Sequence, residues 1–311
     1  MMRKLLVFTA IVVVAGCGVF WSVTSPAVVP GSMLATRVPD LANGQTTFNA
    51  GGCSACHATP DQPDRLRLGG GLAIPSPFGT FYAPNISPDP DDGIGRWREA
   101  DFVTAVLKGT SPEGAHYFPA FPYGSYQRAK VEDVRDLFAY LKTLPPVKGR
   151  IRDHALRFPF NIRRLVGGWK FLYLDGQPFM PDASQSAEWN RGAYLVNGLG
   201  HCAECHSPRD ALGGIVAAQR FAGGPNPEGE GWVPNITQKG LADWSVKAIA
   251  YFLETGDTPD GDSAGGSMTR VIRNMAQLTE ADRMAMAVYL KSLPAVDGPS
   301  RPKKGGSDHA H

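Results

Sequence analysis

The sequence lacks a surplus of either charge. Its 31 lysines and arginines are matched by 29 aspartates and glutamates, which gives a net charge of +2. This balance argues against a nucleic-acid partner and against an acidic, solvating tail. The sequence also contains no Gly-rich phosphate loop, no nucleophile elbow and no metal-hydrolase motif. It therefore shows none of the usual signs of a self-contained nucleotide-dependent enzyme or hydrolase.

Cysteine is scarce, with five residues in 311, and four of them form two distant pairs. A chain of this length can bury a sizeable core, so a disulfide scaffold is not expected. With 43% hydrophobic and 19% charged residues, the composition is that of a folded protein of about two domains. The 36 glycines and 26 prolines predict long loops between helices and argue against a close-packed helical bundle.

There is one long apolar run. Residues 5–23 contain neither a charge nor a proline and follow a short basic start at Arg3 and Lys4. A helix of this length spans about 28 Å, enough to cross a membrane with the basic end in the cytoplasm. An uncleaved anchor, a signal peptide cut near Ala27 or Ala35, and a lipoprotein modified at Cys17 are all open. Each alternative places the functional part outside the cytoplasmic membrane.

The chain contains an internal duplication. Cys53 and Cys202, the first cysteines of the two pairs, are 149 positions apart. Other segments repeat at shifts of 147 to 150: Pro84-Asn-Ile and Pro234-Asn-Ile, Trp97 and Trp244, Gly109 and Gly256, and Tyr140-Leu-Lys and Tyr289-Leu-Lys. Shifts that stay within three residues over a hundred positions indicate a tandem repeat of one domain.

Each copy predicts the same order of elements. An opening helix near residues 41–48 or 189–195 leads to the cysteine pair and then to a Gly- and Pro-rich loop. Helices follow at 99–107 and 245–252, and Gly109 and Gly256 are expected to end them. Closing helices at 132–141 and 280–290 should pack on the opening ones. No alternating run predicts a strand, so the expected fold is mainly α.

The predicted division of the chain has five parts. Residues 1–40 form the export segment and its connection, 41–150 the first domain, 151–185 an aromatic linker, 186–297 the second domain, and 298–311 a disordered tail. The linker is too apolar to float free and is expected to lie across both domains. His309 and His311, at the end of the tail, are expected to be solvated.

The two cysteine pairs are the strongest motif. Cys53-Ser-Ala-Cys56-His57 and Cys202-Ala-Glu-Cys205-His206 both have the spacing of covalent haem attachment. Two intervening residues put both thiols on one turn, where they can add to the two vinyl groups of one haem. The next residue, histidine, then supplies the proximal iron ligand. A dithiol redox pair or a zinc site does not require that histidine in both copies, so we expect two covalently bound haem c groups.

The sixth iron ligands differ between the copies. Met268, in the loop before the closing helix, is the candidate in the second domain, with Met275 in reserve. The first domain has no methionine between Met33 and Met180, and Phe121 occupies the position equivalent to Met268. The candidates there are His116, Met180 or no protein ligand, and the alternative for His116 is a surface histidine.

These motifs carry a family resemblance that covers nearly everything after residue 40. The chain resembles the membrane-associated cytochrome c subunits of bacterial periplasmic dehydrogenases that act on alcohols, gluconate or the substrates of molybdenum hydroxylases. The matching segments are 119–123, 158–161, 191–194, 201–209 and 266–268. The resemblance implies class I cytochrome c domains, electron transfer and Met268 as a sixth ligand. Two departures stand out: two haem domains instead of the common three, and no first-domain methionine.

The predicted function is transfer of electrons from a periplasmic dehydrogenase to an oxidase, a quinone site or another cytochrome. The membrane is a further partner through the N-terminal segment. A dihaem enzyme of the peroxidase or thiosulfate dehydrogenase type, with a catalytic first haem, is the main alternative, and a haem-based sensor is a third. The sequence predicts no catalytic residue. It leaves open the dehydrogenase substrate, the haem potentials and the oligomeric state.

Overall fold

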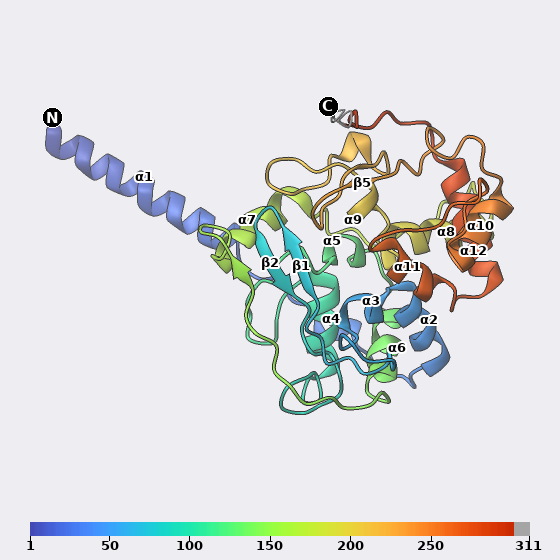
Figure 1. Cartoon of the computed structure of the whole chain (residues 1–311). Coiled ribbons are helices and arrows are strands. Elements are labelled where there is room, and N and C mark those ends of the chain that lie inside the picture. Colours follow the sequence, from blue (N-terminus) through green and yellow to red (C-terminus); the bar gives the residue numbers. More distant parts are fainter. Residues whose placement is uncertain (302–311) are drawn as a thin grey trace, which may run out of the picture.

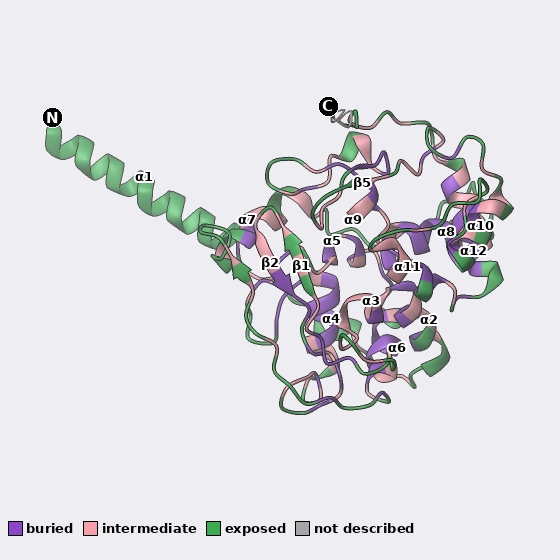
Figure 2. Cartoon of the chain, in the orientation of Figure 1, coloured by how far each residue is buried: buried purple, intermediate pink, exposed green. Residues whose placement is uncertain are grey.

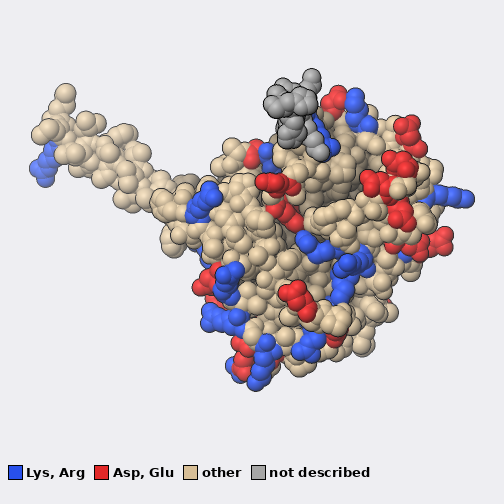
Figure 3. Space-filling view, in the orientation of Figure 1, with Lys and Arg blue, Asp and Glu red and all other residues tan. Residues whose placement is uncertain are grey.

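A single long helix projects from a body of short helices and loops in the computed structural model, which describes residues 1–301 (Figure 1). This helix, α1 (Met2–Val23), has no buried residue and is long and apolar enough to cross a membrane. Figure 3 shows it uncharged except near its free end, where Arg3 and Lys4 lie in the sequence. A buried N-terminal core helix is therefore excluded.

The first half of the body is built on two crossing helices. Asp40 caps α2 (Leu41–Ala50) by accepting hydrogen bonds from two backbone amides, and α2 packs on α6 (Val131–Leu141). Gly44 permits the close crossing, because a Cβ there would lie 2.3 Å from the carbonyl oxygen of Asp136. The expected helix at 99–107 is α4 (Glu99–Lys108), and left-handed Gly109 ends it as predicted.

The second half repeats this packing. The opening helix α8 (Ala187–Tyr194) continues into a π-helical segment, η2 (Leu195–Leu199), and α8 packs on α12 (Glu280–Ser292). A Cβ at Gly192 would lie 1.8 Å from the carbonyl oxygen of Ala285, so this crossing too requires glycine. Between them, α10 (Val246–Thr255) ends at left-handed Gly256. The helices predicted in both halves are confirmed to within a few residues.

The fold is mainly α, as expected, but it also contains short strands that no alternating run had indicated. A hairpin of β1 (Ala73–Ser76) and β2 (Gly79–Tyr82) pairs Ala73 with Tyr82, and β3 (Ala155–Leu156) adds to β2. A second short pair joins β4 (Gly224–Pro225) to β5 (Trp232–Val233). Strands of two to four residues are too short to give a readable alternation in sequence.

The aromatic linker is ordered and contains a helix, α7 (Arg163–Tyr173). Its Trp169 ring packs edge-on against Tyr123 of the first half, and Trp169 Nε1 donates a 3.1 Å hydrogen bond to Leu212 O in the second. Tyr173 donates to Asp210, also in the second half. The linker thus contacts both halves, as expected of a segment with this many aromatic side chains.

One continuous hydrophobic core runs through both halves. It includes Phe48 and Val134 of the first half and Leu195 and Met286 of the second, all of them almost fully buried. Figure 2 shows these buried segments gathered where α2, α6, α8 and α12 lie, with α1 exposed along its length. The two halves are therefore held together by burial of apolar surface as well as by the linker.

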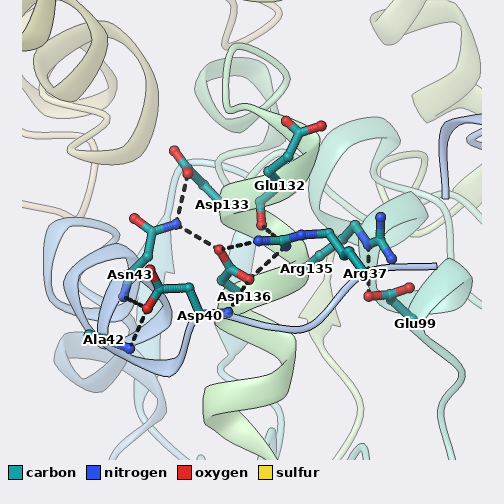
Figure 4. A network of polar contacts seen from close by, with 9 residues as sticks. All are labelled: Arg37, Asp40, Ala42, Asn43, Glu99, Glu132, Asp133, Arg135 and Asp136. Atoms are coloured by element: carbon teal, nitrogen blue, oxygen red, sulfur yellow. Dashed lines mark hydrogen bonds and ion pairs between the residues drawn. The ribbon is translucent and has the colours of Figure 1, made fainter. Parts of the chain in front are cut away.

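The segment between α1 and α2 is fixed to the body by a network around Asp136 of α6 (Figure 4). The Asp136 carboxylate accepts hydrogen bonds from Arg37 (2.6 Å), Asn43 (2.9 Å) and the backbone amide of Asp40 (2.9 Å). Burial would raise the pKa of Asp136, but these hydrogen bonds outweigh it and lower the pKa.

At the other end, Gly298 packs against Ala222, and the Val296 carbonyl accepts from Asn235 (2.8 Å), so the chain up to this point is held. The predicted disordered tail, with His309 and His311, falls mostly on residues 302–311, outside the described part.

Candidate haem-binding sites

The first attachment turn is the short helix α3 (Cys53–His57). It begins after Gly52, whose left-handed conformation (φ 60°) turns the chain out of α2. Cys53 and Cys56 are free thiols and half-buried. Gly51, two residues before the first cysteine, lies close to its thiol, since a Cβ there would be 3.6 Å from Cys53 Sγ. Both thiols therefore lie on one turn, as predicted from their spacing.

His57 is oriented by the backbone. Its Nδ1 donates a 2.8 Å hydrogen bond to the carbonyl oxygen of Pro84, and its own carbonyl accepts from Gly70 (2.8 Å). Burial lowers the pKa of His57, although the bond to Pro84 opposes this, so the neutral imidazole is favoured. With Nδ1 occupied, Nε2 is the nitrogen left for a metal.

The second attachment turn has the same geometry. Cys202 precedes α9 (Ala203–His206), and His206 Nδ1 donates a 2.8 Å hydrogen bond to the carbonyl oxygen of Pro234. The His206 carbonyl accepts from Gly223 at 2.8 Å, and burial likewise lowers the pKa of His206. The repeated Pro-Asn-Ile segments thus have a definite role: each proline carbonyl fixes one imidazole.

Burial disfavours the thiolate form of the attachment cysteines. Burial raises the pKa of Cys53 and Cys205 to about 12 and that of Cys202 to about 11. A redox-active or zinc-binding cysteine needs its pKa lowered. Within residues 1–301 there is also no cluster of three or more cysteine, histidine or acidic side chains that could enclose a metal ion. Two thiols and one oriented imidazole per turn are the donor set that haem c requires.

The two attachment turns lie against each other. Tyr126, on the short helix α5 (Tyr123–Tyr126), donates a 2.8 Å hydrogen bond to the carbonyl oxygen of Gly51, two residues before Cys53. Its ring packs edge-on against His201, which directly precedes Cys202 (centroids 5.5 Å apart). His201 Nε2 also approaches Gly51 O at 3.4 Å. Tyr126 therefore links the two segments that immediately precede the cysteine pairs.

A second connection comes from α11 (Met268–Met275), which packs on α2 and α3. Ser54, between the two cysteines of the first turn, donates a 2.7 Å hydrogen bond to Asn274, and Arg65 donates to Ser54 at 2.9 Å. Both Ser54 and Asn274 are buried. The helix that begins at Met268 thus touches the first attachment turn.

An ion pair lies near a cysteine of each turn. Arg270 of α11 approaches Glu228 at 3.3 Å. Burial is the main cause that raises the pKa of Cys56 and of Cys205, and the negative charge of Glu228 is the second. A single carboxylate is therefore close enough to act electrostatically on both attachment turns.

The expectation that Met268 lies in a loop was wrong, because it is the first residue of α11, where it is half-buried. Gly265 and Gly266 lie in the segment just before this helix. Met275, the reserve candidate, is at the other end of α11 and almost fully buried in the core. Phe121, at the position equivalent to Met268, packs on Tyr126 (centroids 5.8 Å apart).

The two first-domain candidates for a sixth ligand lie in different places. The reading of His116 as a surface histidine was wrong: it is buried, and its Nε2 lies 2.9 Å from Thr24 O at the end of α1. Met180 lies in the linker with its side chain 76% exposed. In the part of the chain that the structure describes, neither one hydrogen bonds to the first attachment turn.

Sequence reasoning missed the residues that join the two turns. In the sequence, Tyr126 stands out only as an aromatic residue, and His201 only as a histidine next to Cys202. No local signal marks Asn274 or Glu228, because their partners are about 40 to 220 positions away.

Comparison with known proteins agrees with this geometry. The cytochrome c family model matches residues 41–145. A diheme cytochrome c-type protein of Cereibacter sphaeroides is 48% identical over 96% of this chain and all of its own length. The fructose dehydrogenase cytochrome subunit of Gluconobacter japonicus is 36% identical over 92% of the chain and 58% of its own.

A further relative is a nicotinate dehydrogenase subunit of Pseudomonas putida, 38% identical over 88% of this chain, which spans 23% of that protein. The two attachment turns and the full-length match together show that the protein binds two haem c groups covalently. The chain belongs to the family of diheme c-type cytochromes.

Proposed function

We propose that this protein carries electrons from a dehydrogenase to the respiratory chain on the outer side of the cytoplasmic membrane. The observation that carries the proposal is the contact between the two attachment turns through Gly51, Tyr126 and His201. Bound haem supplies a one-electron iron couple. Cys53, Cys56 and His57 would hold one group and Cys202, Cys205 and His206 the other, and both turns lie against one packed core.

The dehydrogenase partner is supported by the relatives, several of which are named as cytochrome subunits of fructose, alcohol or gluconate dehydrogenases. The chain spans just over half the length of those subunits. The acceptor is an oxidase, a quinone site or another cytochrome. We place the protein at the membrane through α1, whose apolar length suits an anchor and whose basic end suits the cytoplasmic side.

We also propose that residues 41–150 and 186–297 are two tandem class I cytochrome c domains. Equivalent contacts support this reading: Asn85 donates to Val147 O and Asn235 to Val296 O, at 2.7 and 2.8 Å. Lys142 and Lys291 likewise both donate to loop carbonyls that precede the helices α4 and α10.

For the iron ligands we propose His57 and His206 on one side and Met268 as the sixth ligand in the second domain. In the first domain the proposal lies between His116, Met180 and no protein ligand. His116 could ligate the iron in two ways. Its Nε2 would have to leave the Thr24 carbonyl, or its Nδ1 would have to face the iron, since Nδ1 has no hydrogen-bond partner among residues 1–301. Absorption and electron paramagnetic resonance spectra of His116→Ala and Met180→Ala distinguish them, since only loss of the true ligand changes the first haem.

The electron-carrier proposal is tested in membranes that contain the full chain. Substrates of the candidate dehydrogenases (alcohols, gluconate, fructose and nicotinate) are added one at a time while the haem absorption of the chain is followed. We expect one of them to reduce both haems and oxygen to reoxidise them. A Cys202→Ala/Cys205→Ala variant is the control and should lose the second haem.

The alternative, an enzyme with a catalytic first haem, draws on Phe121 at the position equivalent to Met268. It predicts turnover of hydrogen peroxide or thiosulfate by the purified chain alone. Such turnover, without reduction by any dehydrogenase substrate, would contradict the carrier proposal.

A further inference from the structure

The end of α1 is fixed rigidly to the body. Arg164 of α7 lies over the Trp21 ring, 4.0 Å from its centroid, and donates a hydrogen bond to the Trp21 carbonyl. Thr24, which follows α1, is almost fully buried and its carbonyl lies 2.9 Å from His116 Nε2. Gly167 makes the contact possible, because a Cβ there would lie 2.6 Å from Thr24 O.

This contact sets the depth of α7 relative to a membrane. If α1 spans the bilayer with Arg3 and Lys4 in the cytoplasm, Trp21 reaches the opposite interface, where tryptophan is commonly found. Because Arg164 stacks on Trp21, α7 must start at the same interface. Figure 1 shows α7 at the base of α1, where the long helix joins the body.

The outward side of α7 is apolar. Leu165 and Leu172, two turns apart on one face, are 44% and 62% exposed, and Phe171 beside them is 66% exposed. The chain just before the helix adds three more exposed apolar side chains, Phe158, Phe160 and Ile162. Gly168, on the same face, has no atom within 4 Å of its Cβ position. Phe160 packs partly on Phe78 of the body (ring centroids 4.8 Å apart), whereas Phe158, Phe171 and Leu172 are largely exposed.

The charge of the segment suits anionic lipid. Residues 157–173 contain no acidic side chain, and Arg157 and Arg163 are exposed, whereas Lys170 is turned inward and donates hydrogen bonds to the carbonyls of Lys108 and Gly109. A short helix with exposed aromatic and aliphatic residues on one side and basic residues beside them is typical of helices that lie in a membrane interface. Basic residues next to the surface are attracted to anionic headgroups.

From these observations we infer that α7, with residues 158–162, lies in the outer interface of the membrane and holds the haem-bearing body against the bilayer. The occupant of the apolar face is the lipid surface, continuous with the lipid around α1. The inference rests on the proposed anchoring of α1. It adds a second membrane contact, which fixes the orientation of the body as well as its distance from the bilayer.

The test uses the full haem-loaded chain in nanodiscs of phosphatidylcholine and anionic phosphatidylglycerol. The photo-crosslinking residue p-benzoylphenylalanine replaces, one at a time, Leu172 on α7, Val13 within α1 and Tyr251 on α10. Tyr251 is 54% exposed and serves as the matched control on the body. Lipid adducts are counted by mass spectrometry after illumination. We expect adducts at positions 13 and 172 at several-fold the yield at 251.

One outcome would overturn the inference while leaving the anchor intact. In it, position 13 forms lipid adducts, but the yield at position 172 is no higher than the background yield at position 251. Absence of lipid adducts at 13 would remove its premise and overturn it as well. In native membranes, crosslinks from 172 to another protein instead of lipid would also overturn it. A second variant, Arg163→Glu/Arg164→Glu, should lower the yield at 172 but not at 13. None of these outcomes depends on whether a dehydrogenase reduces the haems.

Discussion

Ser54 and Asn274 are 220 positions apart in the chain, yet the Ser54 hydroxyl donates a 2.7 Å hydrogen bond to the Asn274 amide oxygen. Ser54 lies between the cysteines of the first attachment turn, and Asn274 lies on the helix that begins with Met268. One buried polar contact therefore joins the first attachment turn to α11.

Breaking this contact should destabilise the protein. Ser54→Ala and Asn274→Ala should each lower the free energy of unfolding by about 1–3 kcal/mol, because each leaves a buried polar partner behind. Denaturation of the two single variants and of the double variant completes a cycle. We expect the double variant to lose clearly less than the sum of the single losses. Strictly additive losses would show that the two residues are not coupled.

Met268→Ala should remove the near-infrared methionine-to-iron absorption band and lower the potential of one haem, since a thioether ligand raises it. Met275→Ala is the matched variant on the same helix. It should keep the band but lose about 2–5 kcal/mol of stability, because Met275 is buried in the core. Loss of the band in Met275→Ala, with Met268→Ala unchanged, would transfer the ligand role to Met275.

Gly44 and Gly192 test the tandem architecture. A methyl group at either position would collide with a backbone carbonyl of the facing helix, at 2.3 and 1.8 Å. Gly44→Ala and Gly192→Ala should each cost at least about 2 kcal/mol in thermal or chemical unfolding. Gly168→Ala on α7, where nothing lies within 4 Å, is the control and should be neutral or slightly stabilising. Tolerance of alanine at Gly192 would contradict the equivalence of the two crossings.

The repeat within the sequence made the main helices and both attachment turns predictable. The shift between Cys53 and Cys202 and the glycine stops at 109 and 256 located six helices and both attachment turns, because these depend on local chemistry. The proline carbonyls that orient His57 and His206 could be seen as a repeat, although their role could not.

What could not be predicted depends on contacts between distant segments. Met268 was expected in a loop because it lies between the helix stop at Gly256 and the closing helix, but a helix that packs on α2 and α3 begins at that residue. His116 was considered as a sixth ligand of the first haem, with a surface histidine as the alternative. It is buried because Thr24, 92 positions earlier, reaches it. Neither partner leaves a mark in the local sequence.

Asp136 predicts how stability depends on pH. Its hydrogen bonds lower its pKa in the folded state below the value of about 3.9 for an unperturbed aspartate. The stabilisation is therefore fully present at pH values above the unfolded pKa and is lost as the pH falls through the folded pKa. Asp136→Asn should cost about 2 kcal/mol at pH 7.

The cost of Asp136→Asn should shrink as the pH falls below the unfolded pKa, because the wild-type carboxylate is then protonated first in the unfolded chain and finally in the folded one. Chemical denaturation of both proteins at pH 7 and at acid pH measures the difference. A cost that is independent of pH would show that the charge of Asp136 is not what stabilises the network in Figure 4.

The central claim is that two haem groups are bound covalently, one at each attachment turn. Intact-mass spectrometry of the full chain, matured in a cell with cytochrome c assembly, tests it most directly. We predict a mass that corresponds to two haems, and to one haem in either Cys53→Ala/Cys56→Ala or Cys202→Ala/Cys205→Ala. A wild-type chain that carries one haem or none would contradict the account.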